Sequence, residues 1–346
     1  MDNKKKIGFM QGCLASFVIL VLLVFGFFAF LMLGIKWCCG EVNMADRADT
    51  KCPVDECGPK FNEVWSAGTD SKKSAKVVRI MLSGIISRQR SSSMFDCEAI
   101  ATSAIGVRDR ILAAKNDKNV RAIIIEINSP GGEVTMSDLV WHELQEFKSS
   151  ATNRVVFAHL MDMACSGGYY VAAAADYIYA LPTTVTGSIG VIIPAVNAAA
   201  LAEKVGVKPV SIASSKNKDL LNPLMPTDPE HVAIVKKTVD ETYERFVDVV
   251  AKGRKMPKDC VRKIADGRIL SAEAAREAKL VDAIGYENDV LRYISHKLDS
   301  EVKVVRYESG FSFENFILDG MMMKFSESIK HSIMSIFTDH SMMQYR

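Results

Sequence analysis

The stretch Met163-Ala-Cys-Ser166-Gly-Gly-Tyr-Tyr170 lies where one type of secondary structure gives way to another. A β-rich run, 155–161, precedes it, and an alanine-rich run with helical character, 169–175, follows. Ser166 is therefore predicted at a strand-to-helix turn, where free backbone N–H groups and the positive end of a helix dipole meet. An acyl-transfer nucleophile needs such a position, because those N–H groups can hold an oxyanion. A serine that caps a helix before a Gly-Gly pair explains this stretch equally well when it is taken alone.

Strand–turn–helix units repeat on both sides of this stretch. Strands are predicted at 77–86, 120–127, 155–161, 177–181, near Val210 and at 302–307, with a further apolar run at 191–193. Helices are predicted at 98–114, 135–148, 169–175, 195–204, 229–252, 257–265 and 271–278. The run 120–127 is largely apolar, as expected for a strand that is buried on both faces. The pattern predicts an α/β fold with parallel strands and right-handed crossovers.

Two of the predicted strands end in Gly-Gly turns that lead into helices, at Gly131-Gly132 and at Gly167-Gly168. Glycine lets the backbone approach a bound carbonyl closely and leaves N–H groups free to point at it. Two such turns in one domain could each supply one oxyanion donor. Gly-Gly pairs are also common where helices pack tightly on sheets, but one of these pairs directly follows a serine.

A serine nucleophile requires a general base. None of the six histidines falls in a polar or glycine-rich turn between residues 170 and 230, where a second catalytic element is expected. A lysine can serve instead if burial lowers its pKa from about 10.4 by roughly 3 units. The segment Ser211-Ile-Ala-Ser-Ser-Lys216-Asn-Lys218-Asp-Leu offers two lysines, and leucines follow Lys218. Chemistry alone leaves Lys216, Lys204 and Lys208 open as alternatives to Lys218.

The N-terminal region predicts a membrane anchor. Residues 12–35 carry no charge and are long enough to span a hydrocarbon core of about 30 Å. Lysines precede this run and acidic residues follow it, so residues 1–11 are expected in the cytoplasm and the rest of the chain outside. A cleaved signal peptide would have a shorter apolar run that ends in a small-x-small site. The polar residues 36–75 are predicted to form an extracytoplasmic linker.

Cysteine content and charge exclude several classes of protein. The eight cysteines are scattered and match neither a small disulfide scaffold nor a zinc pattern. Cys52 and Cys57 could close a small disulfide loop in an oxidising compartment or remain free. The net charge of +2 gives no indication of a nucleic-acid partner. We find no motif for a metal, a nucleotide or another cofactor.

Four motifs taken together resemble the signal peptide peptidase A (SppA) family. They are Asn128-Ser-Pro-Gly-Gly132, Ala164-Cys-Ser-Gly-Gly-Tyr-Tyr170, Thr186-Gly-Ser-Ile-Gly-Val191 and Lys218-Asp219. Further similarity lies in Phe246-Val-Asp-Val-Val-Ala-Lys-Gly-Arg254, Ala265-Asp-Gly-Arg268 and Leu280-Val-Asp282. The resemblance covers roughly residues 76–307 and is specific as a combination, although each motif alone is weak. It implies a ClpP/crotonase-like α/β fold of repeated β-β-α units and a membrane-anchored serine–lysine peptidase.

Within this resemblance, five positions match functional residues of the family. Ser166 matches the nucleophile, and Lys218 matches the general base. Ser188 matches the hydroxyl that orients the lysine, and Gly132 and Gly167 match the oxyanion donors. The sequence departs from the family pattern at Cys165, which either packs or offers a second nucleophile. It departs again at Ser215-Lys-Asn-Lys218, which leaves Lys216 as a minor rival base.

The chain matches the short, single-repeat form of the family. That form implies a homo-oligomeric ring whose active sites combine serine and lysine from neighbouring protomers. The resemblance also implies peptide substrates, such as remnant signal peptides, and a single-pass protein of the bacterial cytoplasmic (inner) membrane with its catalytic domain outside. We expect small or apolar side chains at the cleavage site.

Three questions stay open at the level of sequence. A crotonase-like acyl-CoA enzyme or a non-catalytic membrane scaffold could have the same fold, although the predicted anchor argues against the first. The Met- and Phe-rich tail, residues 308–346, has roughly helical spacing and could pack on a domain, lie on the membrane surface or enter the active-site groove. The natural substrate and the ring size are not encoded in any motif.

Overall fold

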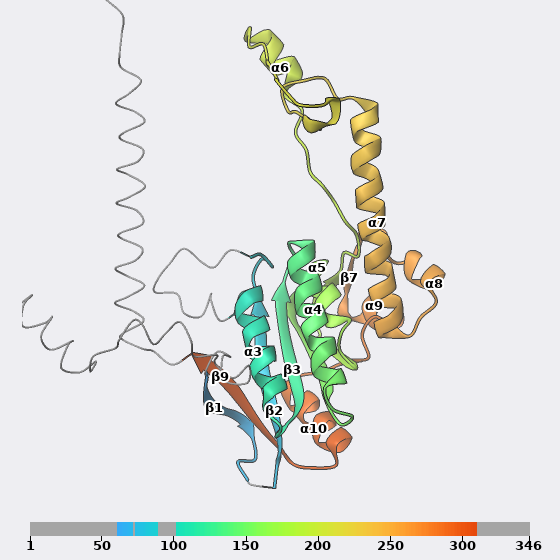
Figure 1. The fold of residues 1–346 in the computed structure, drawn as a ribbon. Coiled ribbons are helices and arrows are strands. Elements are labelled where there is room, and N and C mark those ends of the chain that lie inside the picture. The colour runs from blue at the N-terminus through green and yellow to red at the C-terminus, as the bar shows by residue number, and fades with distance from the viewer. Residues whose placement is uncertain (1–60, 72, 89–101, 310–346) are drawn as a thin grey trace, which may run out of the picture. The chain divides into compact units, whose positions relative to one another are not determined.

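The computed structural model describes residues 61–71, 73–88 and 102–309, which form a nine-stranded sheet with helices on both faces (Figure 1). The predicted anchor, 12–35, the Cys52–Cys57 pair and almost all of the predicted tail lie outside the described residues. Among the helices of the described part, none is long and apolar enough to cross a membrane.

The centre of the sheet is parallel, as the sequence predicts. Strands β2 (Ala75–Ser83), β3 (Val120–Ser129), β4 (Val155–Cys165) and β5 (Tyr177–Ala180) lie side by side. Seven of the nine strands follow the order β1-β9-β2-β3-β4-β5-β8, where β8 is Ala283–Ile284 and β9 is Val302–Ser309. Because parallel strands share one direction, the segments that follow β3 and β4 emerge at the same edge. The Gly131 and Ser166 turns therefore come together.

Side chains of β3 alternate between two apolar cores. Ile123, Ile125 and Ile127 face the larger core, whereas Ala122 and Ile124 face the smaller one. Burial on both faces explains the continuous apolar run in this strand.

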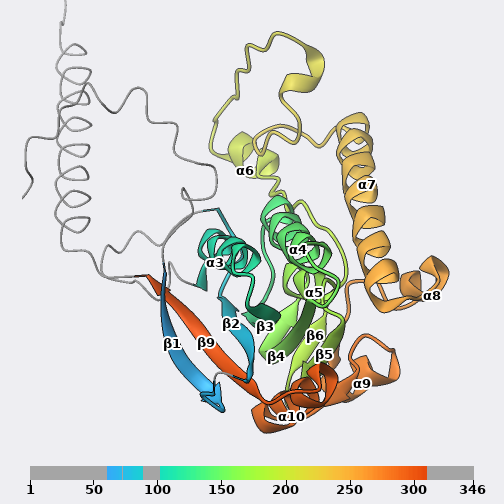
Figure 2. The same ribbon diagram turned by 60° about the horizontal axis from the view of Figure 1, so that its bottom comes forward.

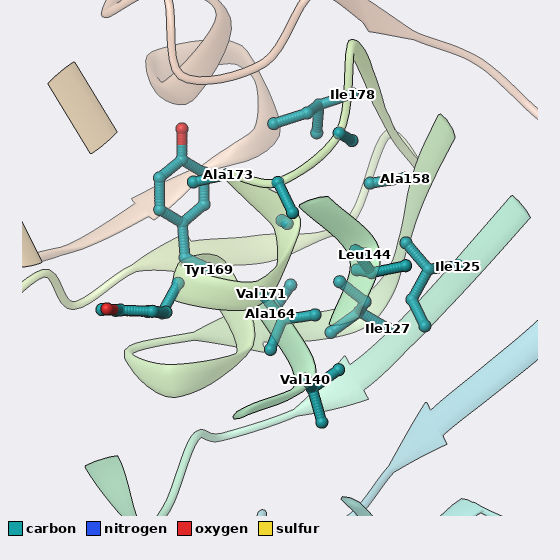
Figure 3. Packing of buried hydrophobic residues seen from close by; sticks show 14 of the residues in the cluster. Ile125, Ile127, Val140, Leu144, Ala158, Ala164, Tyr169, Val171, Ala173 and Ile178 are labelled. Atoms are coloured by element: carbon teal, nitrogen blue, oxygen red, sulfur yellow. The ribbon is translucent and has the colours of Figure 1, made fainter. Parts of the chain in front are cut away.

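Helices cover both cores. The larger core is covered by α3 (Ala104–Asn116), α4 (Val134–Ser149), α5 (Gly167–Ala172) and the C-terminal part of α7 (Pro229–Arg254). The smaller core is closed by α10 (Glu287–Leu298) through Val290 and Ile294 (Figure 2). Figure 3 shows how Val140 and Leu144 of α4 meet Ile127 of β3 and Val171 of α5.

Strand β4 has two successive partners on one side, and this arrangement presents Ser166. Its first half pairs with β5, whereas Met163–Cys165 pair with β6 (Val185–Gly187). Strand β6 in turn pairs with β7 (Ile269–Ser271). The chain leaves β4 at Cys165 and enters α5 at Gly167, so Ser166 lies at the predicted strand-to-helix turn.

Residues 190–228 form a projecting segment that we call the arm. It contains α6 (Ala199–Lys204) and the short 3₁₀ turn η2 (Lys216–Lys218), and it returns to the domain through α7. Figure 1 shows α6 beyond the end of α7 that is farther from the sheet. Helix α7 begins where the Asp228 side chain accepts a hydrogen bond from the Glu230 N–H, a helix-capping contact.

The structure differs from the sequence-based expectation in several places, and the short strands β6, β7 and β8 were not predicted. Residues 61–68, which we expected within the linker, form β1 (Phe61–Gly68) and pair with β9 antiparallel. Helix α10 was not predicted. No strand forms at 191–193 or near Val210, because these residues lie on the arm without a sheet beside them. By contrast, the helices predicted at 257–265 and 271–278 are present as α8 (Lys258–Arg262) and α9 (Ala272–Glu277).

Candidate active site

Ser166 has a strained backbone that presents its side chain at the turn. Its φ of 50° and ψ of −119° fall in a region that residues with a side chain rarely adopt. Its N–H donates to the Gly187 carbonyl at 2.9 Å, and its carbonyl accepts from the Tyr170 N–H at 2.9 Å. The hydroxyl makes no capping hydrogen bond although Ser166 occupies the N-cap position of α5. The helix-capping interpretation is therefore not supported, and the half-buried hydroxyl is free for chemistry.

The two predicted oxyanion glycines lie beside this hydroxyl. A Cβ added at Gly131 would come within 2.8 Å of both the Gly167 nitrogen and the Ser166 Cβ. A Cβ added at Gly167 would lie 3.3 Å from the Gly132 nitrogen. Within the described residues, the Gly132 N–H donates to no backbone or side-chain acceptor. The Gly167 N–H is in the first turn of α5, where backbone donors lack intrahelical partners.

A close approach of two backbones holds this glycine turn in place. Ile86 donates its N–H to the Gly131 carbonyl at 2.9 Å and accepts the Glu133 N–H at 2.7 Å. A Cβ on Gly132 would lie 2.1 Å from the Ile86 carbonyl oxygen. A residue with a side chain at position 132 would therefore prevent this close backbone approach.

Ser188 lies at the end of β6, next to the turn that contains Ser166. The preceding residue, Gly187, provides the carbonyl that accepts the Ser166 N–H. Ser188 also has a φ of 50°, and its N–H donates to the Arg268 carbonyl at 2.7 Å. The structure thus brings together four predicted site residues, Ser166, Ser188, Gly132 and Gly167.

Lys218 is not part of this group within the chain. It lies on the exposed η2 turn of the arm, and its ammonium makes no hydrogen bond or ion pair with any described residue. The burial that we expected from Leu220 and Leu221 is absent, because the arm has no packing layer around η2. The neighbouring Asp219 carboxylate instead accepts a hydrogen bond from the Asn222 amide at 2.9 Å.

The rival lysines are less suited to act as a base. Lys216 forms an ion pair with Glu230 at 2.5 Å, and this hydrogen bond raises the pKa of the ammonium, which keeps it protonated. Lys204 and Lys208 are exposed on the arm, like Lys218. Cys165, the possible second nucleophile, is buried, and burial raises the pKa of its thiol. Its side chain therefore packs and does not form a reactive thiolate.

A small pocket opens beside Ser166, and sequence analysis did not identify its walls. It is about 20 Å³ in volume and is lined by Gly132, Val134, Ser137, Ser166, Gly167, Tyr170, Gly190, Val191, Thr242 and Phe246. Its wall residue Tyr170 donates a hydrogen bond to Asp138, which also accepts from Arg245 at 2.9 Å. Burial, followed by the hydrogen bond to Asp138, raises the pKa of Tyr170. The Tyr170 hydroxyl is therefore a neutral group that holds α5, α4 and α7 around the pocket.

Among the described residues, no group of three or more His, Cys, Asp or Glu side chains could hold a metal ion. The chemistry available in this pocket is that of a hydroxyl nucleophile beside two backbone N–H donors. None of the described residues that line this pocket is a lysine, histidine, aspartate or glutamate.

Comparison with known proteins identifies the family. The model of Peptidase family S49 matches residues 148–302, and the Clp protease model matches residues 85–195. A relative from Enterococcus faecium, described as "Putative signal peptide peptidase SppA", is 34% identical over 248 residues, which cover 71% of this chain and 70% of the relative. The chain belongs to peptidase family S49. This S49 peptidase is therefore a serine endopeptidase. The membership favours this function over the two alternatives left open by the sequence, a crotonase-like acyl-CoA enzyme and a non-catalytic membrane scaffold.

Other relatives differ in length. "Serine protease SPPA, chloroplastic" from Arabidopsis thaliana is 34% identical over 222 residues, which cover 64% of this chain but 32% of the relative. A solved structure of a ClpP1 point mutant from Listeria monocytogenes has a TM-score of 0.40 and 19% identity, and the match covers 61% of this chain and 92% of that chain. The Clp protease model and the observed parallel topology support the predicted ClpP-like α/β fold. The individual roles of Ser166, Lys218, Ser188, Gly132 and Gly167 remain predictions.

Proposed function

We propose that this S49 peptidase cleaves peptide bonds with Ser166 as nucleophile and Lys218 as general base, and that the two residues come from different copies of the chain. The observation that supports this proposal is that Ser166, with backbone N–H groups beside it, lies apart from Lys218, which is exposed on the arm. Ser166 has free oxyanion donors beside it but no base among the described residues. Lys218 has no partner within the part of the chain that the structure describes.

The surface of the arm supports assembly with other copies. Ile212 is 98% exposed, and Ile192 and Val210 are each 84% exposed. Isolated exposed apolar residues are common, but a run of them on a projecting segment is typical of an interaction site. We propose that the arm packs on a neighbouring copy in a homo-oligomeric ring. This packing would bury Lys218 and favour the neutral amine that a base requires.

The proposed mechanism uses only groups of the protein. Neutral Lys218 takes the proton of the Ser166 hydroxyl as its oxygen attacks the peptide carbonyl, and Ser188 orients the amine. The Gly132 and Gly167 N–H groups stabilise the oxyanion. The amine leaves with a proton from Lys218, and water then releases the acyl group from Ser166.

We further propose that the substrates are peptides in or near a membrane, such as remnants of signal peptides. The uncharged run 12–35 with its flanking lysines supports a single-pass anchor in a bacterial cytoplasmic membrane, with the catalytic domain on the extracytoplasmic side. The name of the Enterococcus faecium relative is consistent with such substrates. The small pocket beside Ser166 supports a preference for small side chains at the cleavage site.

Mixing two inactive variants tests the shared site. Ser166→Ala and Lys218→Ala should each abolish hydrolysis of a fluorogenic peptide. When the two variants are unfolded together and refolded, random assembly should restore about a quarter of the wild-type sites. Lys216→Ala is the matched control, and it should retain activity.

Two outcomes would contradict the proposal. Activity of Lys218→Ala alone would exclude this lysine as the base. If both variants are inactive and the mixture also remains inactive, although the mixed oligomer forms, the two residues act within one chain.

A further inference from the structure

A second cavity lies at the end of the sheet opposite to Ser166. Its volume is about 620 Å³, and Val155 and Tyr177, the first residues of β4 and β5, line it. Ser166 follows the last residue of β4, so the wall of the cavity at Val155 lies roughly 35 Å from it along that strand. None of the five predicted site residues, Ser166, Lys218, Ser188, Gly132 and Gly167, lines this cavity.

Positive charge dominates the walls of this cavity. Five cationic side chains line it, together with a single carboxylate: Lys148, Arg154, Lys252, Lys255, Lys297 and Asp176. Gathering like charges around one hollow is unfavourable unless each has a compensating partner.

Contacts within the chain satisfy only two of these cations. Lys148 forms an ion pair with Asp176 at 2.7 Å and donates to the Ala174 carbonyl at 3.0 Å. Arg154 donates to the Lys115 and Asp117 carbonyls, both at 2.7 Å.

The other three cations have no carboxylate in direct contact, and the Asp248 carboxylate, on which the charge of Lys252 acts, forms its ion pair with Lys258. Lys252, Lys255 and Lys297 make no hydrogen bond or ion pair with the residues that the structure describes, and all three are exposed. Helices α4, α7 and α10 end here, and cations near helix C-termini offset the helix dipole. That role would be strongest for ammonium groups bonded to the last carbonyls of these helices, but these three lysines form no such bonds.

Aromatic rings form part of the cavity wall beside the cations. Tyr177 and Tyr293 stack on each other with their ring centroids 4.1 Å apart, and the Trp141 ring also lines the hollow. The combination of unpaired ammonium groups and aromatic surface suits a ligand with several negative charges on a compact group, with or without an attached flat ring.

We propose that this cavity binds a small anion with two or more phosphate groups, held by Lys252, Lys255 and Lys297. Three unpaired cations around one hollow favour a multivalent anion over a single carboxylate or orthophosphate. The phosphates could come from inorganic pyrophosphate or from a nucleotide, which would also contact the aromatic wall.

Calorimetric titration of the full-length chain tests the proposal, with pyrophosphate, orthophosphate, ADP and adenosine as probes. Pyrophosphate should bind with one site per chain, more tightly than orthophosphate. The triple variant Lys252→Gln, Lys255→Gln, Lys297→Gln should weaken binding about tenfold or more, because three charge contacts are lost. If ADP binds more tightly than pyrophosphate, the ligand is a nucleotide whose base also contacts the cavity. If the two bind equally, the cavity recognises only the phosphate groups.

A second triple variant controls for overall charge. Lys118→Gln, Lys237→Gln, Lys263→Gln removes the same charge from exposed sites that do not line the cavity and should leave the affinity for pyrophosphate unchanged. The proposal is overturned if both triple variants weaken binding equally, or if orthophosphate binds as tightly as pyrophosphate. If the triple variant at 252, 255 and 297 binds pyrophosphate as the wild type does but is less stable, the proposal is also overturned. The three lysines would then serve to offset the dipoles of the helices that end there.

Discussion

At the scale of single residues, Ser166 is held in a conformation that serves chemistry at the expense of stability. Residues in such sparsely populated backbone regions cost about 1–3 kcal/mol each. The surrounding contacts at Gly187 and Tyr170 fix the turn, so the strain persists in the folded protein. The backbone of the nucleophile is therefore a local source of instability.

This strain predicts opposite effects of one substitution on stability and activity. Ser166→Gly should raise the free energy of unfolding by about 1 kcal/mol, because glycine adopts this conformation without strain, and should abolish peptide hydrolysis. Lys279→Gly, at another residue with positive φ (61°), should also stabilise the protein but leave hydrolysis intact. Denaturant unfolding and a peptide assay measure both quantities. A less stable Ser166→Gly protein would show that the turn is not strained.

We expect the Phe246 side chain to limit the size of the substrate side chain accepted at the cleavage site. It lines the small pocket beside Ser166, so Phe246→Val should enlarge that pocket. We expect kcat/KM to rise for peptides with leucine before the cleaved bond and to fall for those with alanine, a change of about tenfold in their ratio. Phe147→Val, on the buried face of α4 outside the pocket, should leave that ratio unchanged. An unchanged ratio in both variants would place substrate selection elsewhere.

At the scale of secondary structure, the family motif at 246–254 has a packing role. A Cβ on Gly253 would lie 2.1 Å from the Ala173 carbonyl, so α7 packs directly on the end of α5. The next residue, Arg254, donates two hydrogen bonds to the Asp282 carboxylate, at 2.9 and 2.6 Å. Asp282 also accepts the Ile178 N–H at 2.7 Å, which joins α7 to β5. The motif thus secures α7 to the sheet.

Gly253→Ala should reverse the usual effect of this substitution. Alanine in a helix is normally about 1 kcal/mol more stable than glycine. Here the added methyl group collides with backbone, and we expect a loss of about 1–3 kcal/mol in the free energy of unfolding. Lys237→Ala, on the exposed face of the same helix, should change stability by less than about 0.5 kcal/mol. Stabilisation by Gly253→Ala would show that the two helices are not in such close contact.

The sequence predicted elements whose signal is local and missed those that depend on distant contacts. The apolar runs of β2, β3 and β4 and the glycine turns after β3 and β4 were predictable because burial on both faces and tight turns require those residues. Strand β1 is mostly exposed, and its pairing with β9 identifies it as a strand. The contact of Tyr170 with Asp138 and Arg245 joins three helices far apart in sequence and has no local signal. The choice of Lys218 among the lysines rests on the resemblance and stays a prediction, since the described part of one chain gives it no partner.

At the scale of the whole molecule, the arm leads to a prediction about assembly. The double variant Val210→Glu, Ile212→Glu places charges on exposed apolar positions that we assign to contacts between copies. It should reduce the oligomer to monomers, measured by light scattering, and lower peptide hydrolysis at least about a hundredfold. Its thermal midpoint as a monomer should match that of the dissociated wild type. Val64→Glu, on the edge strand β1, should leave assembly and hydrolysis unchanged. A wild-type monomer with full activity would contradict this assignment.

Helix α7 is long, so a small tilt at one of its ends displaces the other end considerably. Its 26 residues span about 39 Å, with Gly253 and Arg254 at one end and the arm at the other. A tilt of only about 5° at the base would therefore move the far end by roughly 3 Å. Proton transfer from a serine tolerates far less error than this, because it needs hydrogen-bond distances. If Lys218 acts on a neighbouring copy as proposed, the packing of Gly253 on Ala173 and the Arg254–Asp282 ion pair, both remote from the reacting atoms, would limit how precisely that lysine is placed.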